Sequence, residues 1–104
     1  MNTNKKLEEV YRQYEKEKDN IEDLTEILKG RSTLLGISPL DWEADFYDSH
    51  VMLYDWLFAK KHRLIKKVGI NKEDDEENVI TVPTELGKQM YKLIEKRNKK
   101  LVYA

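Results

Sequence analysis

The sequence of 104 residues contains no cysteine, and this absence excludes several kinds of site at once. Without thiols the chain can form no disulfide, no zinc–thiolate centre and no cysteine nucleophile. Long apolar runs are also missing: the longest has four residues, as at 51–54, whereas a membrane-spanning helix needs about 20. The polar N-terminal stretch has no apolar segment of the kind found in signal peptides. We therefore expect a cytoplasmic protein that does not associate with membranes.

Glycine and proline are scarce, at four and two residues, whereas charged residues make up 38% of the chain and apolar residues 39%. This charge content exceeds the roughly 25% of an ordinary globular domain. It indicates an elongated helical protein or one that completes its core with a partner. The aromatic share of 10% argues against a disordered chain. We expect one domain over residues 1–104, whose net charge of −1 gives no overall attraction to nucleic acid or anionic lipid.

Apolar residues recur with seven-residue spacing through the first third of the chain, which predicts one long helix over residues 4–35 within a heptad-patterned segment 1–36. The members of this seam are Leu7, Tyr14, Ile21, Leu28 and Leu35, with Val10 and Leu24 between them. Charged residues at 17 and 31 interrupt the seam. It packs either against the rest of its own chain or against a second copy, in a homodimer formed by the first helix.

A second helix start is marked by Ser38, Pro39 and Asp41. A serine cap, a proline at the first helical position and a carboxylate at the third are typical of a helix N-terminus. Helical spacing of apolar residues then continues to about residue 67, as one helix or as two helices broken near residues 48–49. We expect the tryptophan and phenylalanine side chains of this segment to pack against the first helix.

The last third of the chain predicts a loop, a short strand and a helix. Residues 73–77 are all acidic, which is typical of a solvated loop, and the β-branched residues 79–82 suit a short strand. Pro83 ends the strand and Thr84 can cap the last helix. The fold predicted is therefore mostly α: a long N-terminal helix, then a compact half over 38–104 with a central Trp-rich helical segment and a C-terminal helix. The pattern also allows a small two-stranded wing over 65–82, in a winged-helix-like arrangement.

Two short motifs stand in this half: residues 64–67 read Leu-Ile-Lys-Lys, and residues 84–88 read Thr-Glu-Leu-Gly-Lys. Their order resembles the back half of winged-helix DNA-binding regulators of the MarR and PadR kind, over less than half of the chain. The resemblance implies a recognition helix at 48–58, a wing and DNA binding. Two features depart from the family. Arg63 stands where glycine is usual, and the expected recognition helix has no Lys or Arg to contact phosphates.

Blocks of opposite charge mark two candidate binding surfaces. An acidic–aromatic surface for a protein partner comprises Asp45, Tyr47, Asp48, Asp55 and Trp56. A basic surface for nucleic acid comprises Lys60, Lys61, Arg63, Lys66, Lys67, Lys92 and Lys96. Exposed aromatic residues are typical of protein interfaces. The leading hypothesis is a small regulatory or adaptor protein of a phage or other mobile element that acts by protein–protein interaction. The alternative is a winged-helix-like transcriptional regulator that binds nucleic acid.

No group of residues has the spacing of a catalytic or metal site. His50 and His62 stand twelve positions apart, outside any metal-binding pattern. The carboxylates of Asp41, Asp45 and Asp48 have helical spacing, which suits an exposed helix face at least as well as a cation. General acid–base catalysis needs a positioned pair of groups that this sequence does not present. We therefore expect a binding protein and not an enzyme, with no catalytic residue, cofactor or metal.

Overall fold

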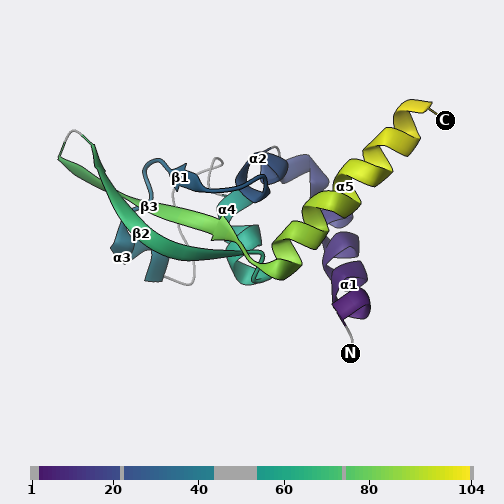
Figure 1. The fold of residues 1–104 in the computed structure, drawn as a ribbon, viewed down its shortest axis with the longest axis horizontal. Coiled ribbons are helices and arrows are strands. Elements are labelled where there is room, and N and C mark those ends of the chain that lie inside the picture. The colour runs from purple at the N-terminus through teal and green to yellow at the C-terminus, as the bar shows by residue number, and fades with distance from the viewer. Residues whose placement is uncertain (1–2, 22, 44–53, 74, 104) are drawn as a thin grey trace.

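The computed structural model describes residues 3–21, 23–43, 54–73 and 75–103 (Figure 1). Its elements are α1 (Thr3–Lys16), the 3-10 helix η1 (Lys18–Asn20), α2 (Leu24–Leu28), β1 (Ser32–Leu34), α3 (Pro39–Glu43), α4 (Tyr54–Lys61), β2 (Ile65–Glu73), β3 (Glu76–Pro83) and α5 (Glu85–Tyr103). Helices and a three-stranded sheet together make a small α+β fold. The prediction of a mostly α fold with a long N-terminal helix is wrong.

The strands form an antiparallel sheet in the order β1-β3-β2. In the β2–β3 hairpin Ile65 pairs with Pro83 and Glu73 with Glu76, and a bulge follows Lys67. The small two-stranded wing that the sequence allowed over 65–82 is thus present as this hairpin. Its second strand is longer than the expected 79–82, and the hairpin belongs to a three-stranded sheet. The acidic segment is not the loop predicted, because strand pairing draws residues 69–73 into β2 and residues 76–78 into β3. Asp75 has a φ of +66°, as tight hairpin turns require.

The heptad-patterned segment is divided among α1, η1, α2 and β1. The break begins at Glu17, whose N–H donates to the carbonyls of Gln13 (3.1 Å) and Tyr14 (3.2 Å), and Ile21 is extended with φ −113° and ψ 111°. A straight helix over 4–35 would be about 48 Å long, as long as the whole molecule, which measures 47 Å along its longest axis. It could not bring both of its ends to one core.

The bend brings the seam into the core of its own chain, which is one of the two alternatives left open by the sequence. Tyr14, Ile21, Leu24 and Leu28 are buried together with apolar residues of α4, β3 and α5. Leu35, by contrast, is 70% exposed and lies beyond the core. Figure 1 shows the hairpin and the C-terminal part of α5 extending from opposite ends of this body.

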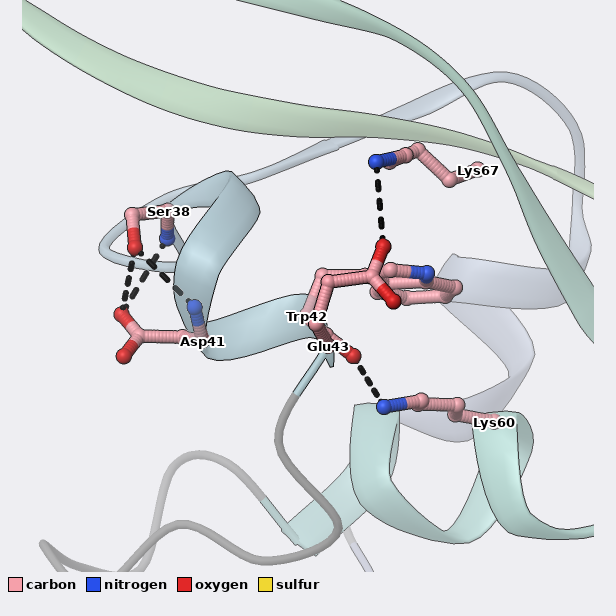
Figure 2. A network of polar contacts seen from close by, with 6 residues as sticks. All are labelled: Ser38, Asp41, Trp42, Glu43, Lys60 and Lys67. Carbon is pink, nitrogen blue, oxygen red and sulfur yellow. Dashed lines mark hydrogen bonds and ion pairs between the residues drawn. The ribbon is translucent and has the colours of Figure 1, made fainter.

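The predicted start of α3 is confirmed by its hydrogen bonds (Figure 2). Ser38 Oγ accepts from Asp41 N–H at 3.2 Å, and the Asp41 carboxylate accepts from Ser38 N–H at 3.3 Å and from Ser38 Oγ at 3.0 Å. This reciprocal capping fixes where α3 begins. The choice between one central helix and two depends partly on residues 44–53, which lie outside the described residues. The helix does end before residue 67, because α4 stops at Lys61.

A tight turn at Arg63 ends α4. Arg63 N–H donates to the Lys60 carbonyl (3.1 Å) and Leu64 N–H to the Ala59 carbonyl (2.7 Å). These are the two bonds of a Schellman motif, whose left-handed residue is usually glycine. Arg63 occupies that position with a φ of +57°. Arg63 therefore departs from the winged-helix pattern in its side chain, but it has the left-handed backbone conformation that favours glycine.

Replacing Arg63 with glycine is expected to stabilise the protein by about 0.5–1 kcal/mol. The left-handed conformation costs a non-glycine residue roughly 1–2 kcal/mol, and the greater freedom of glycine in the unfolded chain offsets about half of this. Urea unfolding followed by circular dichroism measures the change. Arg31→Gly is the matched control, since Arg31 is also exposed but has no positive φ. A midpoint lowered as much by Arg63→Gly as by Arg31→Gly would contradict the explanation.

Candidate functional site

The acidic–aromatic surface does not form as predicted. Asp55 and Trp56 are only 7% and 2% exposed, because α4 turns them into the core. Trp56 stacks on Trp42 of α3, with ring centroids 5.7 Å apart. Burial raises the pKa of Tyr14, and the neighbouring charges of Tyr11 and Asp55 raise it further. Asp45, Tyr47 and Asp48, the other members of that surface, lie outside the described residues.

Two members of the basic surface contact α3 (Figure 2). Lys60 Nζ donates to the Trp42 carbonyl and lies 5.2 Å from the Trp42 ring centroid and 5.7 Å from that of Trp56. Lys67 Nζ lies 3.5 Å from a carboxylate oxygen of Glu43. Lys60 thereby attaches α3 to α4, and we no longer assign it to a binding surface. The Lys67–Glu43 pair contributes little, because the Glu43 side chain is exposed. The exposed members are Lys61, Arg63, Lys66, Lys92 and Lys96.

A groove of about 500 Å³ lies where the end of α2, the base of the hairpin and the first turns of α5 meet. Its polar rim carries Lys29, Lys66, Lys88 and Lys92, with Glu85 as its single carboxylate. We call it the lysine groove. Cavities of about 300–1,000 Å³ are typical of ligand sites. Two of its lysines, Lys66 and Lys92, belong to the predicted basic surface, whereas Lys29 and Lys88 do not.

The charges of this groove are only partly neutralised within the molecule. Lys29 Nζ lies 3.8 Å from Glu26, in an exposed pair that contributes little. No ion pair joins Lys66, Lys88 or Lys92 to a carboxylate in the part of the chain that the structure describes. Lys88 and Lys92 stand one turn apart on α5, where like charges repel by a few tenths of a kcal/mol. An anion bound between them removes that repulsion.

Two further side chains add polar and aromatic groups to the groove. Tyr91 lines it while packing partly against the core. A hydrogen bond from Tyr91 to the Glu95 carboxylate, followed by loss of solvation, raises the pKa of the phenol. Gln89 also lines the groove, and its buried Oε1 has no hydrogen-bond partner among the described residues. An unpaired buried acceptor costs roughly 1–3 kcal/mol.

A corner between β2 and α5 positions the lysines. Thr84 Oγ1 accepts from Gly87 N–H at 3.1 Å and donates to the Arg63 carbonyl at 2.6 Å. Thr84 N–H donates to the Leu64 carbonyl at 2.9 Å. The predicted cap of the last helix is therefore confirmed, and it also fixes α5 to the base of the hairpin. This places Lys66 of β2 beside the first turns of α5.

Among the described residues, no group of three or more His, Asp or Glu side chains is arranged to hold a metal ion. None of the helices in the same part of the chain is long and apolar enough to cross a membrane. Comparisons of the chain with protein-family models, with curated proteins and with solved structures found no match. The winged-helix resemblance therefore stays a prediction.

Proposed function

We propose that this protein is a small, non-enzymatic regulatory protein that binds nucleic acid through the lysine groove. The observation that carries the proposal is the convergence of Lys66, Lys88 and Lys92 on one concave surface, without carboxylate partners among the described residues. Contacts between basic side chains and phosphates supply most non-specific affinity for nucleic acid. A net charge of −1 does not oppose this, because Glu85 is the one carboxylate among the residues that line the groove.

The order of elements supports the same proposal. The winged-helix resemblance implies a recognition helix, a two-stranded wing and a following helix, and α4, the β2–β3 hairpin and α5 follow one another in this way. The mode of binding must differ from the one the resemblance implies. Asp75, Glu76 and Glu77 at the hairpin turn are exposed and acidic, so the tip of the hairpin repels a phosphate backbone.

Salt-dependent binding tests the proposal. Fluorescence anisotropy of labelled DNA and RNA oligonucleotides, single-stranded and duplex, is measured with the intact protein at low and moderate salt. Three lysines that each neutralise one phosphate give a slope of log affinity against log salt of about −2 for single strands. Absence of binding to every oligonucleotide at low salt would overturn the proposal.

Protein–protein contact is the second candidate function, and exposed apolar residues favour it. Leu35 and Leu40 are 70% and 85% exposed, and Val68 and Ile70 on the outer strand β2 are each 47% exposed. Exposed apolar residues that gather into a patch often mark interaction sites. Sedimentation of the intact protein over a range of concentrations distinguishes a homodimer from a monomer that binds a different protein.

A further inference from the structure

We propose that the lysine groove binds a single strand of nucleic acid, with one unpaired base seated beside Tyr91 and the neighbouring phosphates held by Lys66, Lys88 and Lys92. The inference rests on the proposed function and names its ligand: a phosphodiester strand, DNA or RNA, whose bases are free of pairing. A duplex keeps its bases stacked inside and presents mainly phosphates and groove edges.

The lining of the groove is the first argument for an unpaired base. Between the lysines it offers apolar groups of Leu28, Val82 and Pro83. A phosphate gains nothing from these apolar groups, because burial against them removes its hydration without a compensating hydrogen bond. A flat, largely apolar base gains by leaving water there. The groove of about 500 Å³ is also a concave site, whereas the surface of a duplex is convex.

Tyr91 is the second argument. Proteins that bind single strands combine a positively charged groove with aromatic side chains on which bases stack, and Tyr91 is an aromatic side chain that lines this groove. A phosphate without its base has no ring to place against Tyr91, so this side chain favours an unpaired base.

The spacing of the lysines is the third argument. Lys88 and Lys92, with Lys96 one turn further, follow one side of α5 at intervals of about 6 Å along its axis. A flexible strand can follow this row while one of its bases turns into the groove. A duplex laid on the hairpin in the usual winged-helix manner instead meets the acidic turn at Asp75, Glu76 and Glu77.

The experiment compares ligands that share their phosphates but differ in their bases. Anisotropy is measured for a short oligothymidylate, for a strand of the same length made of abasic units, and for a duplex. We expect the native protein to bind the oligothymidylate about tenfold more tightly than the abasic strand, because a stacked base contributes on the order of 1–3 kcal/mol. An oligouridylate of equal length then shows whether RNA or DNA is preferred.

A pair of variants assigns the effect to Tyr91. Tyr91→Leu is expected to weaken oligothymidylate binding about tenfold without changing abasic-strand binding or the salt slope. Tyr91→Phe, which keeps the ring, is expected to bind like the native protein. Equal affinity of the native protein for abasic strand, oligothymidylate and duplex would overturn this inference and leave the proposed function standing. Binding to none of them at low salt would overturn both. The native comparison needs no variant, so a misfolded Tyr91→Leu cannot obscure the result.

Discussion

Gly87→Ala is expected to destabilise the protein by about 3 kcal/mol or more. A Cβ at position 87 would lie 2.9 Å from the Leu64 carbonyl carbon and closer still to its oxygen. These are backbone atoms, and the same Leu64 carbonyl accepts the N–H of Thr84 at 2.9 Å. Relief of the clash therefore requires α5 to move away from the base of the hairpin. That movement loses the corner hydrogen bonds, at about 1 kcal/mol each, and adds overpacking strain of about 1–3 kcal/mol.

Chemical unfolding followed by circular dichroism measures this loss, and Gly30→Ala provides the control. A Cβ at Gly30 meets nothing within 4 Å, and Gly30 has no positive φ. Its replacement is expected to change stability by less than about 1 kcal/mol, with stabilisation the favoured sign. Equal unfolding midpoints for Gly87→Ala and the native protein would show that α5 does not sit this close to β2.

Local signals in the sequence predicted two helix starts correctly, those of α3 and α5. The groups at Ser38 and Thr84 act on N–H groups only three residues away, so their chemistry is readable without knowledge of the fold. The heptad seam was only partly informative. Spacing identifies which residues are apolar together, and Tyr14, Ile21 and Leu28 are indeed buried. It does not reveal a bend, since a broken segment can bury the same residues as a straight helix.

The pairing of strands that lie far apart in the chain could not be predicted from the sequence. The three residues of β1 have no strand pattern of their own and become a strand only through pairing with residues 79–81. The prediction that Asp55 and Trp56 lie at the surface was wrong. The face that α4 turns into the core depends on the elements that it packs against, and these are not known from the sequence. The groove joins Lys29 and Lys66 to Lys88 and Lys92 across three elements. The four-residue spacing of the lysines on α5 was a signal in the sequence that they share one side of a helix. Which other residues lie beside them depends on the corner at Thr84.

The triple substitution Lys66→Gln/Lys88→Gln/Lys92→Gln is expected to reduce nucleic-acid affinity at low salt by about a hundredfold or more. Each lysine that neutralises a phosphate contributes roughly 0.7 to the salt slope for a single strand, so the slope should flatten by about 2. Stability should not fall, because the change removes the repulsion between Lys88 and Lys92, worth a few tenths of a kcal/mol. Lost binding combined with unchanged or slightly raised stability excludes unfolding as the cause.

The control removes the same charge elsewhere, in Lys5→Gln/Lys6→Gln/Lys72→Gln. Lys5 and Lys6 lie near the start of α1, and Lys72 lies near the turn of the hairpin; none of the three lines the lysine groove. All three are exposed. If attraction depends on net charge alone, both triple variants lose affinity equally, and the lysine groove is not the site. If the groove positions the phosphates, the control keeps nearly all of its affinity and its salt slope, because the lysines that it removes do not contact a strand held in the groove.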